Sequence, residues 1–447
     1  MASTDDHREN EHLEDQDEGE QFIQAEDVEV EVTDEGDIPM EDDDEPAPSA
    51  SHEGGDGDLQ TNAVSVFNTH TNSVFAVGVH PTRPLVVSGG QDDLGYIWDM
   101  SDGEVLVKLT GHTDSVTGAN FSPDGELVAT GGMDGKVRVW RRVKTGARAG
   151  KGKEASAAAE GKGKEAETDE DWKHWEFLTE LQGPDEVMWV KWHPKGNVLL
   201  VGSNDGTAWM WQLPSGTTMQ VFAGHSGSVQ CGEFTPDGKR VVTACAGGDL
   251  IVWDPRSPTP VFKLSEGNSR LSTDGVTSLG INPASTIAVV GGANGAVHLV
   301  GLAKGEVIAT LSAGHTPGES IEAIAFTNFS GGGSGALLTG ASDGIICVWD
   351  LTTMRLRSSF KHDDTVTSLI AVPAPKNYLV VSACADGSLR TWDARTGSLV
   401  REHNGHQGAV LSFALALDGT TIVSAGDDGV CLVFTTEETD EEGRMAE

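Results

Sequence analysis

Histidine, serine or threonine, and aspartate recur in this chain at spacings that could form a catalytic trio. In the first copy, His70 is followed by Ser88 and Asp92. A histidine that accepts the proton of a hydroxyl and is oriented by a carboxylate is the arrangement of many hydrolases. The same trio returns in several later copies, however, and catalysis would need it only once. The repetition therefore favours a structural role for these residues.

Each trio is followed by an aromatic residue, which indicates a buried hydrogen-bond network. In such a network the aspartate orients the histidine, the histidine reaches the hydroxyl, and the tryptophan donates its indole N–H. The complete sets are His70/Ser88/Asp92/Trp98, His112/Thr130/Asp134/Trp140, His315/Thr339/Asp343/Trp349 and His362/Ser382/Asp386/Trp392. The last copy has His406, Ser424 and Asp428, followed by Phe434 in place of tryptophan.

The aromatic residues give the period of a repeat. They are Trp98, Trp140, Trp211, Trp253, Trp349, Trp392 and Phe434, and Val300 takes this place in the fifth copy. Successive positions lie 42 to 49 residues apart, except for 71 residues between Trp140 and Trp211. Strand-like runs separated by Asp-Gly turns fill each period. A period of roughly 40–45 residues with a Gly-His…Trp-Asp signature is typical of WD40 repeats, which build β-propellers.

The two ends of the repeat region predict how the ring closes. The last copy has no outer strand after Phe434, whereas the apolar run 63–67 precedes the first histidine and has no partner of its own. If this run supplies the outer strand of the last copy, two exposed sheet edges disappear. We therefore predict an all-β fold, an eight-bladed WD40 β-propeller over residues 59–436.

Several copies depart from the regular pattern. Pro184 takes the histidine position in the third copy, Gly247 the aspartate position in the fourth, and Asn294 with Val300 occurs in the fifth. We expect apolar packing to hold these three blades. Residues 141–176 interrupt blade two and contain the sequence GKGKEA twice, which we interpret as a flexible insertion. No Ser or Thr follows the lysine, so a phosphate-binding loop is not indicated.

The charge of the chain is strongly negative and unevenly placed. The formal net charge is −40, and residues 1–58 hold many Asp and Glu against one basic residue, Arg8. This segment is predicted to be disordered, and 437–447 is a shorter acidic tail. Such acidity argues against direct binding of nucleic acid or an anionic membrane and favours a basic protein partner. Solubility alone is the alternative explanation of the acidic segment.

Cysteine usage and hydropathy predict an intracellular protein. The five cysteines lie in strand-like runs and lack metal-binding spacing, so we expect reduced core residues, no metal and no cofactor. The chain has no 18-residue apolar run and no signal-peptide core. We therefore expect a monomer in the cytoplasm, and also in the nucleus.

Aligning the copies assigns charged residues to the two faces of a propeller. On the top, the loops that enter each first strand hold Asp114, Asp185, Glu186, Asp274, Glu319, Asp363 and Asp364, and other turns add Asp93, Asp249 and Asp427. Arg270 and Lys361 are the main basic exceptions there. The bottom turns are assigned Arg83, Lys195, Lys239, Arg240, Arg256, Lys304, Arg355, Arg357, Lys376 and Arg395. An acidic ring of this kind would attract a segment rich in Lys and Arg.

Part of the third copy resembles a known family. The segments are GPDEV at 183–187, WHPKGNVLL at 192–200, and 205–216, which contains DG, WMW and PSG. They resemble the angio-associated migratory cell protein family, whose fungal relatives are WD-repeat chaperones of one large-subunit ribosomal protein, universal number sixteen or yeast number ten. The resemblance implies that the acidic top captures the basic N-terminal segment of that newly made protein and delivers it for 60S assembly.

Three other functions are alternatives to this escort role. A histone chaperone or another nuclear scaffold would also suit an acidic propeller. A substrate receptor of a ubiquitin ligase would need a recruiting domain, and none is recognisable outside the repeats. An enzyme is disfavoured, because no acid/base pair or nucleophile occurs outside the repeated positions.

Overall fold

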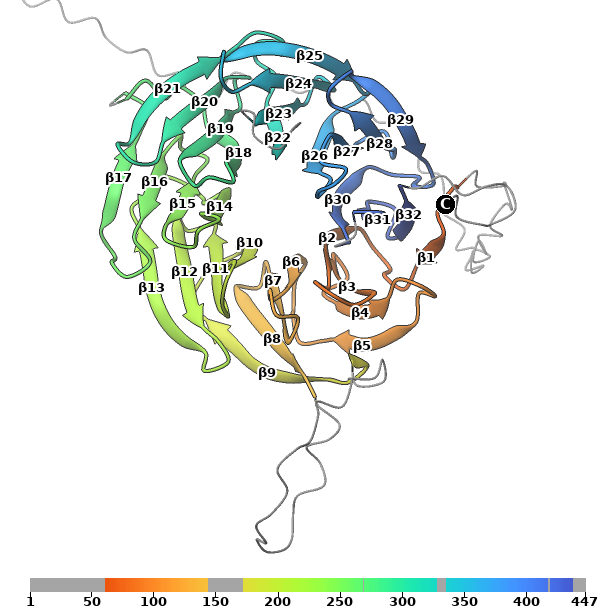
Figure 1. Ribbon diagram of the computed structural model, residues 1–447. Coiled ribbons are helices and arrows are strands. Elements are labelled where there is room, and N and C mark those ends of the chain that lie inside the picture. Colours follow the sequence, from red (N-terminus) through yellow and green to blue (C-terminus); the bar gives the residue numbers. More distant parts are fainter. Residues whose placement is uncertain (1–60, 144–171, 268, 328–334, 417–418, 437–447) are drawn as a thin grey trace, which may run out of the picture. The chain divides into compact units, whose positions relative to one another are not determined.

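The computed structural model describes residues 61–143, 172–267, 269–327, 335–416 and 419–436. The predicted acidic segments 1–58 and 437–447, and all but the ends of the predicted insertion 141–176, lie outside the described residues. Within the described part, 32 strands form eight antiparallel sheets of four strands each, which stand side by side in a closed ring (Figure 1). No helix of the described residues is long and apolar enough to cross a membrane.

The strands follow the chain around the ring, and in every blade the first strand is innermost (Figure 1). Blades one to four consist of β2 (Val74–Val79), β3 (Leu85–Gly90), β4 (Gly95–Asp99) and β5 (Val105–Leu109); β6 (Val116–Phe121), β7 (Leu127–Gly132), β8 (Lys136–Arg142) and β9 (Trp175–Gln182); β10 (Val187–Trp192), β11 (Val198–Ser203), β12 (Thr207–Gln212) and β13 (Thr217–Ala223); β14 (Cys231–Phe234), β15 (Val241–Ala244), β16 (Leu250–Trp253) and β17 (Pro260–Leu264).

Blades five to eight continue the same order. They consist of β18 (Val276–Ile281), β19 (Ile287–Gly292), β20 (Val297–Gly301) and β21 (Glu306–Leu311); β22 (Ile321–Thr327), β23 (Ala336–Ala341), β24 (Ile345–Asp350) and β25 (Arg355–Lys361); β26 (Val366–Ala371), β27 (Leu379–Cys384), β28 (Leu389–Asp393) and β29 (Ser398–His403); β30 (Val410–Leu415), β31 (Thr421–Gly426), β32 (Cys431–Thr435) and β1 (Ser65–Phe67). The eight-bladed all-β fold predicted from the repeats is confirmed.

Blade eight is closed by a strand from the beginning of the repeat region. Strand β1 pairs antiparallel with β32, with Phe67 opposite Cys431. The Phe67 ring is buried and stacks on Trp98 of blade one, with ring centroids 4.5 Å apart and planes at 4°. The predicted closure by residues 63–67 is therefore confirmed, and Phe67 also joins the sheet of blade eight to the next blade.

Apolar packing between neighbouring blades forms the core. The second strand of each blade is almost wholly buried, as in β3 and β7, because both faces of the sheet are covered by other blades. The outer strands carry exposed apolar side chains, such as Val261 of β17. In blade five, Val300 fills the tryptophan position and is fully buried. This blade therefore keeps its fold without the indole, as the predicted apolar packing requires.

Each face of the ring is built from two sets of connections. We call the upper face the loops that lead from one blade into the first strand of the next, together with the turns between the second and third strands. The lower face consists of the remaining turns. The loop residue His70 lies 3.0 Å from Asp92 of the turn between β3 and β4, so these two sets lie on the same side.

Candidate functional site

The repeated histidine, hydroxyl and aspartate form a closed buried network in blade one. His70 Nδ1 lies 3.0 Å from the Asp92 carboxylate, and its Nε2 lies 2.9 Å from Ser88 Oγ. The Trp98 indole N–H donates to the same oxygen at 3.3 Å. Burial lowers the pKa of His70, against the opposing effect of Asp92, so the ring is neutral near pH 7. A hydroxyl buried between these two partners holds the blade together and is not exposed to a substrate.

The other three complete copies and the last copy keep the bond between histidine and hydroxyl. The distances from His Nε2 to the hydroxyl oxygen are 2.8 Å for His112 and Thr130, 2.7 Å for His315 and Thr339, 2.6 Å for His362 and Ser382, and 2.7 Å for His406 and Ser424. Thr130 and Thr339 are both 0% exposed, so neither threonine hydroxyl could meet a substrate. The same buried geometry in several blades supports the structural interpretation.

The aspartate of the network differs between blades. The distance from His Nδ1 to the carboxylate is 3.0 Å in blades two and eight, but 4.0 Å in blade six and 3.9 Å in blade seven. In blade six the Asp343 carboxylate instead accepts from the backbone N–H groups of Thr316 and Ile345, both at 2.9 Å. The network predicted for His315, Thr339 and Asp343 is therefore closed at the hydroxyl but open at the carboxylate.

The tryptophan of the network differs between the two complete copies that use threonine. The Trp349 indole N–H donates to Thr339 Oγ1 at 2.9 Å, as predicted. In blade two, where both residues are described, no hydrogen bond joins Trp140 to Thr130. The Trp140 ring lies edge-to-face against Phe177 of the outer strand, with centroids 5.9 Å apart, so ring contacts hold it instead. The predicted indole bond to Thr130 was therefore wrong, and His112 is the partner that fixes this hydroxyl.

Blade four has a carboxylate that the alignment of the copies misplaced. Gly247 takes the aspartate position in sequence, yet Asp249 accepts a hydrogen bond from the Ser226 backbone N–H at 2.9 Å, as Asp92 does from Thr71 at 3.2 Å. Asp249 is only 2% exposed, so its assignment to the acidic surface was wrong. Burial alone would raise the pKa of Asp249, but hydrogen bonds from Ser265, Lys263 and Ser226 outweigh it and lower the value to about 2. Asp249 is therefore a structural carboxylate.

Replacing the central hydroxyl of one network tests its structural role. The Ser382 hydroxyl is buried between His362 Nε2 at 2.6 Å and the Trp392 indole N–H at 2.8 Å. We expect Ser382→Ala to lower the free energy of unfolding by about 2–3 kcal/mol, because two buried polar groups lose their partner. Urea unfolding measures this. Ser398→Ala, which removes an exposed hydroxyl at the start of β29, should change the value by less than about 0.5 kcal/mol. Equal changes in the two variants would contradict the assignment.

Two groups of His, Cys and Asp lie closer together than their sequence spacing indicates. Their ligand atoms lie within 4.8 Å of one another in His225/Cys245/Asp249 and in His362/Cys384/Asp386. In both groups the carboxylate already has a cationic neighbour, Lys263 at 2.9 Å from Asp249 and Arg390 at 3.6 Å from Asp386. Burial raises the pKa of the Cys384 thiol to about 12, so this sulfur is protonated. The cationic neighbours oppose a metal cation, and we assign these groups to the structural networks.

The upper face is strongly acidic. Within the described residues its loops and turns hold Asp or Glu at 17 positions and Lys or Arg at one, Arg270. The acidic positions are Asp92, Asp93, Asp114, Asp134, Asp185, Glu186, Asp205, Asp249, Glu266, Asp274, Glu319, Asp343, Asp363, Asp364, Asp386, Asp427 and Asp428. Those of the networks are largely buried, so the negative potential arises from fixed structural carboxylates as well as from exposed ones.

The structure places all eight predicted partner-binding acids in the loops or turns of the upper face. Seven are exposed and one, Glu186, is half-buried; the exposed ones are Asp114, Asp185, Asp274, Glu319, Asp363, Asp364 and Asp427. Some have partners on the same face: Glu186 accepts from Asn204, Glu319 from Ser342, and Asp427 from Ser73. Their proposed contact with a partner stays a prediction.

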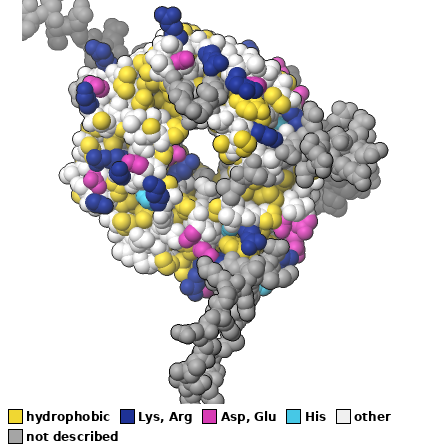
Figure 2. Space-filling model, in the orientation of Figure 1, with side chains coloured by type: hydrophobic (Ala, Val, Ile, Leu, Met, Phe, Trp, Pro, Cys, Tyr) yellow, Lys and Arg dark blue, Asp and Glu magenta, His cyan; other side chains and the backbone are white. Residues whose placement is uncertain are grey.

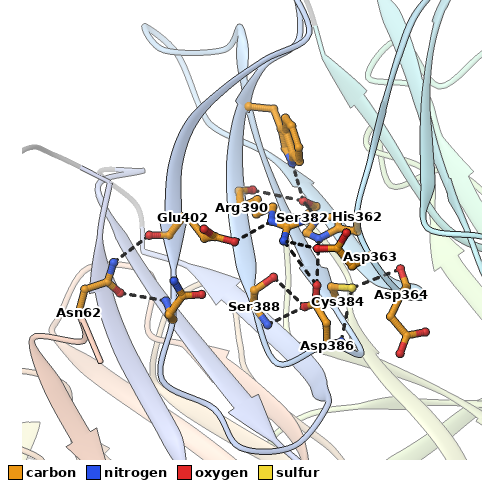
Figure 3. Close-up of polar contacts among 12 residues, drawn as sticks. Asn62, His362, Asp363, Asp364, Ser382, Cys384, Asp386, Ser388, Arg390 and Glu402 are labelled. Carbon is orange, nitrogen blue, oxygen red and sulfur yellow. Dashed lines mark hydrogen bonds and ion pairs between the residues drawn. The ribbon is translucent and has the colours of Figure 1, made fainter. Parts of the chain in front are cut away.

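Basic side chains that the sequence assigned to neither face reach the upper face from the strands. Arg390 of β28 donates to Asp363 at 3.0 Å and to Glu402 at 3.0 Å, and lies 3.6 Å from Asp386 (Figure 3). Lys263 of β17 pairs with Asp249 at 2.9 Å. The prediction that the upper face has almost no basic residues was therefore correct for its loops and turns. It was incomplete because it left out basic side chains that reach this face from the strands. Asp363 remains 87% exposed, so its charge still faces solvent.

A central channel opens through the ring (Figure 2). First-strand residues enclose a channel volume of about 900 Å³, with Lys191 of β10 and Glu233 of β14 among them. Burial raises the pKa of Glu233, against the opposing effect of Lys191. A separate hollow of about 250 Å³ on the upper side is lined by Gln230, Asp274 and Glu322. Glu322 is the second residue of strand β22, so it lies outside the loops and turns from which the aligned copies predict the charge of each face.

The lower face carries both signs of charge. Its described turns hold nine Lys or Arg (Arg83, Lys173, Lys195, Lys239, Arg240, Arg256, Lys304, Lys376 and Arg395) and six Asp or Glu (Asp102, Glu104, Asp124, Glu126, Asp237 and Asp254). On the face seen in Figure 2, Lys and Arg side chains gather over β10–β17, on the left. Arg355 and Arg357, which the sequence placed in a bottom turn, belong to strand β25. The described lower face is therefore mixed and locally basic, whereas the described loops and turns of the upper face are predominantly acidic.

Comparisons with known proteins agree with this architecture. The model of the family "WD domain, G-beta repeat" matches residues 61–99, 103–141, 175–212, 216–254, 305–350, 354–393 and 397–435, and leaves the degraded fifth copy unmatched. The human angio-associated migratory cell protein is 31% identical over 390 residues, which cover 84% of this chain and 80% of the human one. The ribosome assembly protein SQT1 of Saccharomyces cerevisiae is 28% identical over 427 residues, 88% of this chain and 91% of the yeast one.

Solved structures extend the likeness to three dimensions. The crystal structure of Chaetomium thermophilum Sqt1 bound to the N-terminus of the ribosomal protein L10 has a TM-score of 0.73 and 28% identity, and covers 84% of this chain and 100% of that one. The crystal structure of Saccharomyces cerevisiae Sqt1 has a TM-score of 0.71 and 26% identity, with 84% and 99% covered.

Proposed function

Because this chain belongs to the WD40 repeat family, and within it to the family of the angio-associated migratory cell protein, we propose that it is a dedicated ribosomal-protein chaperone. It binds the basic N-terminal segment of a newly made large-subunit ribosomal protein on its upper face and delivers that protein for 60S assembly. The observation that carries this proposal is the likeness, over 84% of the chain, to a Sqt1 structure bound to the N-terminus of L10.

The charge of the upper face supports a basic client. Exposed carboxylates lie in the upper-face loops or turns of most blades, and within the described residues those loops and turns hold only Arg270 as a counter-charge. Fields of this kind raise the rate of encounter with a cationic segment and select against acidic ones. A client that is rich in Lys and Arg would also be shielded from RNA while it is bound, because its positive charges face the acidic surface.

The chaperone acts by binding and not by chemistry. In blades one, six and seven, the hydroxyl that a hydrolase would use is buried and bonded to histidine and tryptophan. The exposed carboxylates lie on separate loops around the ring and need no metal or cofactor to attract a cationic peptide. We propose that the protein works as a monomer in the cytoplasm, where ribosomal proteins are made, and also in the nucleus, without contacting nucleic acid or membranes directly.

Recovery of the bound client from each compartment tests this function. We expect a tagged full chain, purified separately from cytoplasmic and nuclear fractions, to retain one large-subunit ribosomal protein as the main partner in peptide identification. Binding to an N-terminal peptide of L10 should exceed binding to a histone-tail peptide of equal charge at least about tenfold. Recovery of histones without a ribosomal protein would replace the proposal by the histone-chaperone alternative.

A further inference from the structure

The hollow on the upper face lies beside the mouth of the central channel. It has a volume of about 250 Å³ and is formed by blades four, five and six, with Gln230, Asp274, Thr277 and Glu322 as its polar lining residues. Gln230 also lines the channel, so the two spaces adjoin. The volume is smaller than the roughly 300–1,000 Å³ of sites that enclose a whole small molecule. The hollow therefore has room for one long side chain of a bound segment.

Three small residues create this hollow. Blades four and five hold Ala246 and Ala293 in the turn after the second strand, and the backbone N–H of each donates to a carbonyl of the loop before the first strand. The same hydrogen bond identifies the equivalent residues of blades one to three, which are Gln91, Met133 and Asn204. In blade five the accepting carbonyl belongs to Gly275, which has no side chain to occupy the space. The hollow is therefore a property of these blades and not of every repeat.

The charged residues that line the hollow are both acidic. Asp274 donates its backbone N–H to Glu266 at 2.7 Å, but within the described residues no hydrogen bond or ion pair engages its carboxylate. Glu322 accepts a hydrogen bond from the Ser320 hydroxyl. It is the extra residue of a β-bulge at the start of β22, a feature that changes the direction of a side chain. Because neither carboxylate has a cationic partner, the hollow attracts a positive charge.

A further carboxylate without a partner lies in the adjoining channel. Glu233 is largely buried, and in the part of the chain that the structure describes no hydrogen bond or ion pair reaches it. Lys191 also lines the channel and offsets part of this charge, but it makes no ion pair with Glu233. Glu233 follows Gln230 by three residues, which corresponds to about 10 Å along a strand. A charge that is removed from water and unpaired is costly, so a cation nearby would stabilise it.

The hollow combines space for one side chain with unpaired negative charge, and it lies on the face to which we assign the client. We propose that one Lys or Arg side chain of the client's basic segment enters the hollow and binds between the carboxylates of Asp274 and Glu322. This inference rests on the proposed function. The other acids of the upper face attract the segment as a whole, whereas the hollow selects one residue and thereby fixes the register of the segment on the ring.

Filling the hollow without changing its charge tests this contact. Ala293→Met introduces the side chain that blade two has at the equivalent position, and should weaken binding of an N-terminal L10 peptide to the full chain about tenfold in fluorescence anisotropy. Ala385→Met is the matched control, because Ala385 is the equivalent residue of blade seven, is also partly exposed and lies outside the hollow. It should change the affinity less than about twofold. Equal losses of affinity in the two variants would overturn the proposal.

A charge variant separates binding in the hollow from general attraction. Asp274→Asn/Glu322→Gln removes both charges with side chains of similar shape, and asparagine tolerates the positive φ of 52° at position 274. Its binding is compared with that of the unaltered chain for L10 peptides in which each Lys or Arg is replaced in turn by Ala. We expect the variant to bind every peptide about tenfold less tightly except the one that lacks the inserted residue, for which the loss should be less than about threefold.

The possible results separate this proposal from the proposed function. A loss of affinity that is equal for all peptides would show general attraction and overturn the inference, and so would unchanged affinity for all of them. Either result leaves the proposed function standing, because the unaltered chain still binds L10. If the unaltered chain does not bind the L10 peptide, the proposed function is wrong and this inference is overturned with it.

Discussion

Reversing two charges on the upper face should abolish most of the affinity for a basic client. We expect Asp363→Lys/Asp364→Lys to weaken binding of an N-terminal L10 peptide about 100-fold, because two attractive charges become repulsive at an exposed acidic rim. Fluorescence anisotropy at a fixed salt concentration measures the change. The unaltered chain should also bind less tightly as salt rises from about 0.05 to 0.5 M, since the Debye length falls severalfold over that range.

A matched variant on the opposite face shows whether position or total charge matters. Asp102→Lys/Glu104→Lys changes the net charge by the same amount in the β4–β5 turn of the lower face. It should alter the affinity less than about threefold, because long-range charge is screened. An equal loss of affinity in both variants would show that the total charge of the protein, and not its position on the upper face, determines binding. If Asp363→Lys/Asp364→Lys bound the client with unchanged affinity, the client would bind at another surface of the protein.

The same variant needs a check on folding, because Asp363 has a structural neighbour. Arg390 donates to Asp363, but it also donates to Glu402 and lies near Asp386. These two carboxylates keep Arg390 paired when Asp363 is replaced. We therefore expect the thermal midpoint to fall by no more than a few degrees, so that a loss of affinity can be read as a loss of contact.

Removing the ring of Phe67 should cause the largest loss of stability. The Phe67 side chain is 1% exposed and stacks on Trp98, so it fills the seam between the last blade and the first. Phe67→Ala leaves a cavity there and should lower the free energy of unfolding by about 3–5 kcal/mol. The midpoint of urea unfolding reports this loss. Detachment of β1 would also expose the edge of β32, so we expect aggregation during heating.

The neighbouring residue supplies the control for this experiment. Val66 is the adjacent residue of β1, points to the opposite side and is 48% exposed. Val66→Ala should therefore cost less than about 1 kcal/mol. If both variants lose the same stability, the seam owes its strength to the backbone pairing of β1 with β32 and not to the Phe67 ring.

Local patterns were enough to predict most of the fold. The period of the tryptophans, the Asp-Gly turns and the unpaired run 63–67 depend only on the order of residues in the chain, and each repeat folds into one blade. Even the fifth copy, which the family model leaves unmatched, could be counted from its spacing. Its Val300 is buried where other blades bury tryptophan, so position in the repeat determined burial more than residue type did.

Through-space contacts account for what the sequence missed. Asp249 lies two residues from the expected position, and only the hydrogen bond from Ser226 shows that it replaces the missing aspartate. Arg390 belongs to a strand, yet its long side chain reaches Asp363, 27 residues away, on the upper face. Such contacts depend on side-chain length and blade packing, which a repeat alignment does not contain.

The hydrogen bonds inside each network also depend partly on position in the repeat and partly on contacts through space. The alignment of the copies placed Thr130 and Thr339 at equivalent positions, and both are buried beside a histidine. Only Thr339 also accepts from its tryptophan, because the orientation of an indole ring depends on the side chains packed around it. Equivalent positions therefore predict burial well and individual hydrogen bonds less well.

The eight-bladed ring and the acidic character of its upper loops could be predicted from the order of residues in the chain, because both follow from position within a repeat. Side-chain packing in the folded ring sets which carboxylates are exposed and which are buried, and it pairs bases with acids on the lower face. It also brought Lys239, Arg240 and Arg256 together around apolar side chains of two blades. Neighbouring blades meet only when the ring closes, so a surface made by two of them is a property of the folded chain.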